Sequence, residues 1–489
     1  NLAGFNTAPI EKVSVGLIEI MNRGKAFIRM FDWLIEKEKA ISCERFNIGI
    51  KYLTMKKLLT ILMILPFFGF GQWTKFYHNN QMQFISNAEQ TTDSGFIVSG
   101  VTKAPGSTSG GNDYDMIIMK TDINGDSLWS KVFGGYEEDV VNKVIQTSDG
   151  GYALVGYSDN LDSNNVTYSF ILKTDANGDS LWMKPLTRND EVFSFEQTSD
   201  GGYIVVGKHF SIYGVLIKTN ALGDTLWTRI LEDTLYNYSA AYDVKQTIDG
   251  GYIIIGEIGP NSNNNNDNAF IVKTDSNGYT LWSNTFGGSS IDFSEGHSIE
   301  QTTDGGYIYT GYLSDTTTTG VYFLLVKTDD LGNTIWWKKY QVSLYQTAAF
   351  NVQQTTDGGY IIGGVSIEWT GSYDLLIIKT NDVGDTTWTR QINYGEEDFG
   401  SIQQTTDGGY IIAAHASNPA WNNYADLTLI KLDASGNIIS STLDVALKNP
   451  NRKLMKITNV LGQETTEKKN TPLFYIYDDG TVEKKIVIE

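Results

Sequence analysis

The chain has 489 residues, of which 41% are hydrophobic and 12% aromatic, so it can bury a large core and is not intrinsically disordered. Its formal charge is −20 at pH 7. This acidity argues against nucleic acid or an anionic membrane as a partner, because both require a basic face. With 49 Gly and only 8 Pro, the composition indicates many tight turns rather than stiff linkers.

Residues 55–71, MKKLLTILMILPFFGFG, have the pattern of a secretory signal peptide. Two lysines give the positive start, a short apolar run follows, and small residues precede Gln72. The apolar run is too short to span a bilayer, and no other stretch is long enough, so we expect no integral membrane domain. We expect residues 1–54 to be upstream sequence translated in frame. The alternative is an N-terminal extension.

Processing before Gln72 would change both the charge and the redox chemistry of the chain. It would leave 27 Lys/Arg and 51 Asp/Glu, a formal charge of −24. It would also remove Cys43, the only cysteine. The mature chain is then expected to be held together by packing and hydrogen bonds rather than by disulfides.

A sequence close to QTSDGGYALVG recurs at intervals of 49 to 56 residues. A second piece, close to KTDANGDSLW, follows it in each unit. A period near fifty residues is typical of one four-stranded blade of a β-propeller. The seven copies of the first piece begin at Gln90, Gln146, Gln197, Gln246, Gln301, Gln354 and Gln404.

Both pieces predict hairpins. Asp-Gly in the first and Asn-Gly in the second stand between runs rich in Ile, Val, Tyr and Thr, and glycine accepts the positive φ of a short turn. Each unit is therefore expected to have four strands, and the whole to be an all-β, seven-bladed β-propeller over residues 72–448. An open β-solenoid is the alternative, although its coils usually have shorter repeats.

A tryptophan recurs at one place in the second piece, and we interpret it as a packing wedge between neighbouring blades. Trp73 stands in a matching W-x-K-x-F, so Gln72–Tyr77 is predicted to close the ring as the outer strand of the last blade. The alternative is that Asn437–Leu443 fills that place. The six repeated tryptophans are Trp129, Trp182, Trp227, Trp282, Trp336 and Trp388.

Strand order predicts that the Asp-Gly and Asn-Gly turns lie on one face and the two variable connections on the other. Variable loops on a rigid scaffold often carry binding. These segments are SDNLDSNNVTYS, GPNSNNNNDNA and SNPAWNNYAD, together with GGYEEDVV, GGSSIDFSEG and YGEEDFG, which are expected nearer the central channel.

The combined pattern QTxDGGYIIxG…KTDxxGDxLW resembles secreted repeat proteins of the Bacteroidetes group, which are generally predicted to be propellers. Its D-x-x-G-x-x-x-W part is similar to the tryptophan-docking motif of quinoprotein propellers. There the spacing from Asp to Gly is one residue longer, so cofactor binding does not carry over.

The last 41 residues, 449–489, differ from the repeats and resemble a C-terminal sorting tail of type IX secretion. The matching pieces are KITNVLGQET and FYIYDDGTVEKKIVIE, which predict two or three strands as a short β tail. The resemblance implies contact with the type IX secretion machinery and a secreted or outer-surface location. The opening Tyr-Pro-Asn-Pro strand of that family is reduced here to Asn449-Pro450-Asn451.

The sequence offers no recognised catalytic motif. Its four histidines, His78, His209, His297 and His415, lie in different units and are interpreted as surface or satisfied side chains. No metal site or cofactor is assigned, with calcium as the alternative. Asp122-x-Asn124-Gly125-Asp126 places oxygen donors at alternate positions, as calcium loops do, but other copies keep the glycine and lose the carboxylates, which favours a turn.

Acidic and aromatic residues of the variable segments are the candidate ligand contacts. Paired carboxylates could serve a glycosidase, and tryptophans suit sugar stacking, although a solvated acidic rim is the simpler interpretation. The candidates are Glu137, Glu138, Asp139, Asp292, Glu396, Glu397, Asp398, Trp369 and Trp421.

Three hypotheses for the function follow. The first is a secreted or cell-surface propeller that acts as a non-catalytic binding or adhesion module for glycan or protein. The second is a polysaccharide-degrading glycoside hydrolase that uses acidic loop residues at the channel mouth. The third is a structural surface repeat protein. Propellers carry many unrelated functions, so the fold does not choose among them.

Overall fold

The computed structural model describes residues 72–77, 83–103, 114–134, 138–158, 167–188, 190–210, 212–231, 238–259, 267–287, 291–315, 320–341, 346–367, 373–393, 397–417, 425–438, 454–458, 465–466, 472–477 and 482–486. Every regular element within these ranges is a β-strand. None of the described segments is a long apolar helix of the kind that crosses a bilayer.

Four-stranded antiparallel sheets, which we call blades, follow one another along the chain. The fifth and sixth of these sheets along the chain share one parallel bridge, Val321 to Gln346. Blade 1 is β2 (Gln83–Gln90), β3 (Phe96–Lys103), β4 (Tyr114–Thr121) and β5 (Ser127–Phe133), and blade 2 is β6 (Asp139–Gln146), β7 (Tyr152–Ser158), β8 (Tyr168–Thr174) and β9 (Ser180–Arg188). Blade 3 is β10 (Asp190–Gln197), β11 (Tyr203–His209), β12 (Tyr213–Thr219) and β13 (Thr225–Leu231), and blade 4 is β14 (Tyr238–Gln246), β15 (Tyr252–Gly259), β16 (Asn268–Thr274) and β17 (Thr280–Phe286). Blade 5 is β18 (Ile291–Gln301), β19 (Tyr307–Asp315), β20 (Val321–Thr328) and β21 (Thr334–Tyr340), and blade 6 is β22 (Gln346–Gln354), β23 (Tyr360–Ile367), β24 (Tyr373–Thr380) and β25 (Thr386–Ile392). Blade 7 is β26 (Glu397–Gln404), β27 (Tyr410–Ser417) and β28 (Ala425–Leu432), completed by β1 (Trp73–Tyr77).

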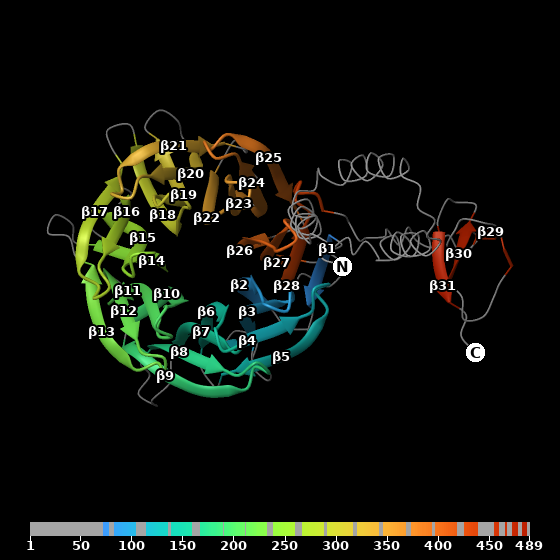
Figure 1. Ribbon diagram of the computed structural model, residues 1–489, viewed down its shortest axis with the longest axis horizontal. Helices are drawn as coiled ribbons and strands as arrows, with labels where there is room; N and C mark the ends of the chain where they lie inside the picture. The colour runs from blue at the N-terminus through green and yellow to red at the C-terminus, as the bar shows by residue number, and fades with distance from the viewer. Residues whose placement is uncertain are drawn as a thin grey trace, which may run out of the picture. The chain divides into compact units, whose positions relative to one another are not determined.

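The blades form a ring in which the first strand of each lies at the centre and the last at the rim (Figure 1). Seven hydrophobic clusters hold the ring, and each draws its buried residues from two neighbouring blades. The expected all-β propeller is thereby confirmed, and the described blades agree with the expected number of seven. The open solenoid is wrong because the last blade packs on the first.

Strand β1 closes the ring. It pairs antiparallel with β28, and Trp73 faces Lys431 there as Trp129 faces Lys120 in blade 1. The prediction that Gln72–Tyr77 supplies the outer strand of the last blade is confirmed. Of the alternative segment, only Asn437 and Ile438 lie within the described residues, and neither belongs to a strand.

The turn between the first two strands of a blade explains the T-x-D-G-G sequence. In blade 2, Asp149 Oδ1 accepts hydrogen bonds from the Thr147 hydroxyl at 2.7 Å and the Gly151 amide at 3.0 Å. Its other oxygen lies 3.0 Å from the buried Lys173 ammonium. Gly150 has φ +84°, and a Cβ on Gly151 would lie 2.5 Å from Lys173 Nζ. The motif therefore links the turn to β8 through the Asp149–Lys173 ion pair. A side chain larger than that of glycine at position 151 would not fit beside this pair.

The repeat glutamine links each blade to the preceding one. Gln146 Oε1 accepts from the Thr92 amide of blade 1 at 2.8 Å, and the same bond recurs at every interface. Gln90 accepts from the Thr406 amide of blade 7 at 2.8 Å, which completes the ring. Sequence reasoning located this glutamine but gave no reason for it.

Each repeated tryptophan rests on the Asn-Gly-type turn of the next blade. A Cβ on Gly278 of blade 4 would lie 2.5 Å from the Trp227 ring of blade 3, and Trp227 also meets Tyr252 with ring centroids 6.1 Å apart. Two residues later, a lysine often pairs with the aspartate after that glycine, as in Lys131–Asp179 at 2.6 Å. The predicted wedge between blades is confirmed.

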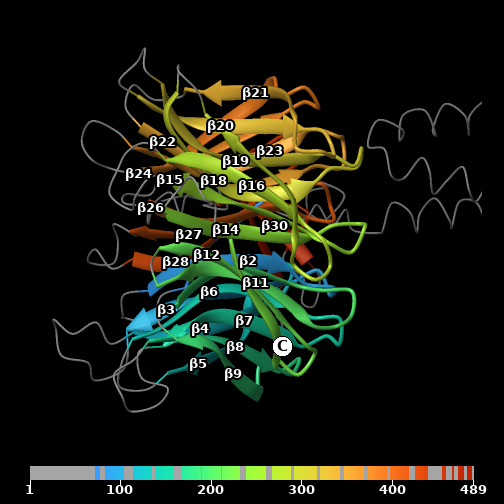
Figure 2. The same cartoon turned by 90° about the vertical axis from the view of Figure 1, so that its left-hand side faces the viewer.

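The two hairpin turns of each blade lie at one end of its strands, and Figure 2 shows them along one edge of the propeller. We call this end the turn face and the opposite end the loop face. Near the C-terminus, β29 (Leu454–Thr458), β30 (Pro472–Tyr477) and β31 (Val482–Ile486) form a three-stranded antiparallel sheet, which agrees with the predicted β tail. The Asp479-Gly480 turn lies outside the described residues.

Candidate functional site

The inner strands enclose a cavity of about 700 Å³ on the ring axis. Each inner strand ends at its repeat glutamine, so its residues can be counted back from there. In every blade the register shifts between the fifth and third residues before the glutamine, which places a β-bulge at the fourth. A bulge breaks the alternation of side chains, and the fourth and third residues consequently both line the cavity.

The fourth residue before each glutamine forms the layer nearer the loop face. In blades 3 to 6 this residue is an aromatic ring, and we call these four residues the aromatic arc: Phe193, Tyr242, His297 and Phe350. Ring centroids lie 5.3 Å apart for Phe193–Tyr242, 4.9 Å for Tyr242–His297 and 5.2 Å for His297–Phe350. The other three blades contribute Gly400, Ser86 and Asn142. One side of the wall is therefore aromatic, and the other is small and polar.

A pair of glutamates lies behind the arc. The hydroxyls of Tyr238 and Tyr242 donate to Glu257 Oε1 at 2.6 and 2.5 Å. Glu257 of β15 and Glu295 of β18 are hydrogen-bonded to each other, and Tyr312 also bonds Glu295. Neither glutamate lines the cavity, so the pair supports the wall from behind.

The two glutamates differ in acidity. Burial raises the pKa of Glu257, and the neighbouring Glu295 raises it further. Burial also acts to raise the pKa of Glu295, but the neighbouring His297 and the Tyr312 hydroxyl outweigh it and lower that pKa. Glu257 is therefore the member of the pair that holds a proton more readily.

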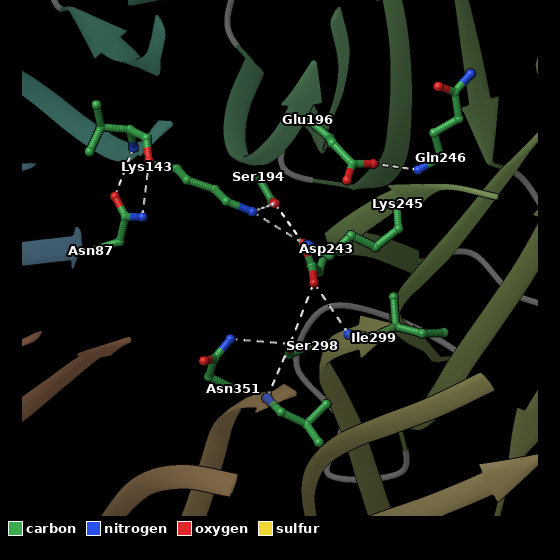
Figure 3. Close-up of polar contacts among 12 residues, drawn as sticks. Asn87, Lys143, Ser194, Glu196, Asp243, Lys245, Gln246, Ser298, Ile299 and Asn351 are labelled. Carbon is green, nitrogen blue, oxygen red and sulfur yellow. Dashed lines mark hydrogen bonds and ion pairs between the residues drawn. The ribbon is translucent and has the colours of Figure 1, made fainter. Parts of the chain in front are cut away.

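The third residue before each glutamine forms a polar ring one layer deeper (Figure 3). Lys143 Nζ donates to Ser194 Oγ at 2.8 Å, and the Ser194 hydroxyl donates to Asp243 Oδ1 at 2.7 Å. Lys245 reaches the same oxygen at 3.4 Å, and the Ser298 hydroxyl reaches Asp243 Oδ2 at 3.4 Å. Asp243 thus joins blades 2 to 5 across the channel. The ring consists of Asn87, Lys143, Ser194, Asp243, Ser298, Asn351 and Ser401.

The residue directly before each glutamine forms a third layer towards the turn face. Where this residue is Glu or Gln, its side-chain oxygen accepts from the backbone amide of the next blade's repeat glutamine, as in Gln353 Oε1 to the Gln404 amide at 2.6 Å and Gln403 Oε1 to the Gln90 amide at 2.8 Å. Burial is the largest cause that raises the pKa of Glu89 and of Glu300 to about 7. The layer consists of Glu89, Ile145, Glu196, Lys245, Glu300, Gln353 and Gln403.

We expect stability to fall between pH 4.5 and about 7 because folded Glu89 and Glu300 hold protons that the unfolded chain releases. Replacing both with glutamine should remove a loss of about 3 kcal/mol per glutamate from this window. Glutamine fits, since Gln353 and Gln403 occupy the same register. Urea unfolding at a series of pH values measures the slope, with the exposed Glu191→Gln as control. A double variant that keeps the wild-type slope would contradict the assignment.

The nine sequence-predicted site residues fall into two groups. Glu137, Glu396, Trp369 and Trp421 lie outside the described residues, and the side chains of Asp292 on β18 and Glu397 on β26 are also outside the description. Glu138 precedes β6, and Asp139 begins that strand with 7% of its surface exposed. Asp398 is exposed on β26 opposite His415. None of the described candidates lines the channel cavity, and their role stays a prediction.

The residues that do line the channel were not singled out from the sequence. GGSSIDFSEG was expected near the channel, and it contains Glu295. His297 follows two residues later, and it belongs to the channel wall rather than to an ordinary surface. Aligning the seven units on their glutamines would have revealed the aromatic run, because the fourth preceding residue is Phe, Tyr, His and Phe in consecutive units.

The turns that raised the calcium alternative use their carboxylates in another way. Asp122 Oδ1 accepts the amides of Asn124 and Asp126, both at 2.8 Å. Asp126 Oδ1 lies 2.6 Å from Lys75 of blade 7. Among the described residues, no group of three or more His, Cys, Asp or Glu side chains is arranged to hold a metal ion. The turn geometry agrees with the turn interpretation, and calcium binding stays an untested alternative.

No protein-family model and no curated protein matches the sequence. Solved structures match at low identity. A protein of unknown function from Bacteroides caccae is 13% identical over 64% of this chain and 94% of its own, with a TM-score of 0.37. One of unknown function from Dyadobacter fermentans is 11% identical over 74% and 97%, with a TM-score of 0.43. The β-propeller domain of the Trilobed protease from Pyrococcus furiosus is 9% identical over 73% and 99%, also with a TM-score of 0.43. At these scores the matches carry no argument about activity.

Proposed function

We propose that the protein is a non-catalytic binding module whose central channel takes a carbohydrate. The observation that carries the proposal is the aromatic arc, which faces small polar side chains across a cavity of about 700 Å³. Small-molecule sites are typically about 300–1,000 Å³, with aromatic walls and a few placed polar groups. A pyranose ring has apolar C–H faces that pack on aromatic rings and hydroxyls that hydrogen-bond, so it matches both walls.

Charge favours a neutral sugar. The described lining includes Glu89, Glu196 and Asp243 against Lys143 and Lys245, and the whole chain carries a formal charge of −20. An anionic ligand such as a polyuronate would meet the repulsive field of the whole chain at long range. We therefore expect neutral glycans to bind more tightly than acidic ones.

Two observations weigh against the glycoside hydrolase hypothesis. Glycoside hydrolases hold their two carboxyl groups about 5–5.5 Å or about 6.5–9.5 Å apart, with the sugar between them. Glu257 and Glu295 are hydrogen-bonded to each other and do not line the cavity, so a sugar has no place between them. The other acidic candidates that the structure describes lie away from the cavity, which leaves binding as the better-supported role.

A secreted or outer-surface location belongs to the same proposal and rests on the sequence. It is supported by the signal-like residues 55–71 and by the resemblance of residues 449–489 to a type IX sorting tail. A surface protein is the alternative partner to a glycan. A purely structural surface role is the remaining alternative.

The test is a pull-down of the full chain with neutral polysaccharides (cellulose, xylan, mannan) and acidic ones (alginate, pectate), with and without calcium. Phe350→Ala should weaken binding to a neutral polysaccharide by 10-fold or more, because the substitution removes one ring of the arc. Trp337→Ala, at a tryptophan 43% exposed on β21, is the matched control and should bind like wild type.

Each outcome separates the hypotheses. Binding without sugar release supports the proposal, and calcium dependence would revive the loop carboxylates. Release of soluble sugar would favour the hydrolase. Absence of binding to every polysaccharide would overturn the carbohydrate proposal in favour of a protein partner or a structural role.

A further inference from the structure

We propose that Glu257 and Glu295 are the positioning residues of the channel site, and that one shared proton holds Tyr242 and His297 in the aromatic arc. The inference rests on the proposed function for its consequence in binding. Its geometric basis is the pair of tyrosine hydrogen bonds to Glu257, the stacking of the rings and the contact between Glu295 and His297.

Tyr242 is the member of the arc that the pair holds directly. Its hydroxyl donates to Glu257 Oε1 at 2.5 Å, and its ring stacks on His297 with planes 22° apart. Tyr238 donates to the same oxygen at 2.6 Å. With Oε1 accepting two phenol hydrogens, the proton of Glu257 is placed on Oε2, where it donates to Glu295. A neutral carboxyl group is therefore the species that satisfies every partner at this point.

Glu295 holds His297 from the other side. His297 Nε2 lies 3.5 Å from Glu295 Oε2, and the imidazole is stacked between Tyr242 and Tyr312, with centroids 4.9 and 5.3 Å away. The two central rings of the arc thus depend on two glutamates from different blades. The hydrogen bond between the carboxyl groups is what joins the two supports.

Loss of the shared proton would place two carboxylates in contact at a buried site, where like charges repel strongly. Burial and the neighbouring Glu295 raise the pKa of Glu257 above the usual glutamate value. We therefore expect the arc to loosen only as the pH rises beyond that value. The surrounding groups are Tyr238 and Tyr242 on β14, Lys208 on β11, Asp267 before β16, His297 on β18 and Tyr312 on β19. The Lys208 ammonium donates to the Tyr238 hydroxyl at 3.0 Å.

The key variant is Glu257→Gln. Its amide oxygen can accept both tyrosine hydroxyls, and its amide NH2 can donate to Glu295 at any pH. We expect the variant to keep the neutral-pH near-ultraviolet circular dichroism of the wild type. In a Glu89→Gln/Glu300→Gln background, which removes the two other glutamates whose pKa is raised in the channel, it should lose the infrared carbonyl band that Glu257 contributes, together with any dichroism change that accompanies deprotonation of the pair. Glu257→Leu removes the acceptor and the donor together, and should show the loosened tyrosine signal at every pH. Asp382→Asn, in an exposed turn, is the control.

The spectroscopic titration needs no ligand, so its failure is distinct from failure of carbohydrate binding. A Glu89→Gln/Glu300→Gln protein whose carboxyl band is unchanged by adding Glu257→Gln, or a Glu257→Gln variant that titrates like its parent, would overturn the inference. If a neutral polysaccharide binds, its affinity should fall at least 10-fold in wild type as the carboxyl band disappears, and stay constant in Glu257→Gln. Equal pH dependence in both would refute the positioning role while leaving the binding site intact.

Discussion

Trp73→Ala is expected to lower the free energy of unfolding by about 3–5 kcal/mol, the usual cost of truncating a buried tryptophan. Trp73 is 6% exposed, and its ring meets Phe96 of blade 1 at 5.8 Å between centroids. A Cβ on Gly125 of blade 1 would lie 2.5 Å from the same ring. Because β1 and β28 complete blade 7, the cavity left by the substitution opens where the two ends of the propeller meet.

Chemical denaturation of the full chain measures this effect. Trp227→Ala is the comparison within the chain, since Trp227 makes the same contact between blades 3 and 4 without closing the ring. Trp337→Ala is the surface control and should cost less than about 1.5 kcal/mol, because Trp337 is 43% exposed and keeps one edge contact with Phe286. A loss at Trp73 no larger than that at Trp337 would mean that β1 does not hold the ring closed.

The fold could be predicted because its determinants are local and repeated. Asp-Gly and Asn-Gly turns fix hairpins, the fifty-residue period fixes the blade, and Trp73 reveals the closing strand by matching the six internal tryptophans. Each of these signals depends on residues a few positions apart. Repetition then removes the ambiguity that any single copy would leave.

The channel wall could not be predicted in the same way, because two features depend on contacts between blades. The bulge at Tyr242 and its equivalents breaks the alternation on which inward and outward positions are assigned. Glu257 and Glu295 lie 38 residues apart on different blades, and no spacing rule joins them. A useful signal was present, however. Positions that differ among otherwise similar repeats mark where a repeated scaffold has been specialised.

The acidic loop residues illustrate the opposite error. Asp139 was predicted to contact a ligand because of its acidic neighbours in GGYEEDVV. In the structure it lies at the start of β6, seven residues before the repeat glutamine. At the same register in blades 4 and 5, Ser239 and Ser294 accept amide hydrogens from Gly214 and Ala269 of the preceding blades. That register position lies between blades, so an acidic residue there faces its neighbours before it faces a ligand.

The second large effect is expected from Asp243→Ser. Burial favours the neutral acid, but Lys245 and Lys143 outweigh it and lower the pKa of Asp243 to about 2, so the group is ionised at neutral pH. Removing it leaves two lysine ammonium groups in the channel without their shared carboxylate, at a cost of about 3–5 kcal/mol. Serine fits the site, because Ser194 and Ser298 occupy the same register in the neighbouring blades.

A triple variant separates charge from packing. Lys143→Asn, Asp243→Ser and Lys245→Gln together replace the charged triad with residue types that other blades carry at the same registers, namely Asn87, Ser194 and Gln353. Neutral replacements of buried ion pairs are often as stable as the pair, so we expect the triple variant to recover most of the loss. The wild type should also lose the contribution of ionised Asp243 to the free energy of unfolding as pH falls from 3.8 to about 2, and the triple variant should not.

If the triple variant is as unstable as Asp243→Ser alone, the loss comes from packing and hydrogen bonds around Asp243 rather than from unpaired charge. The charged triad would then be part of the scaffold rather than a specialisation of the channel.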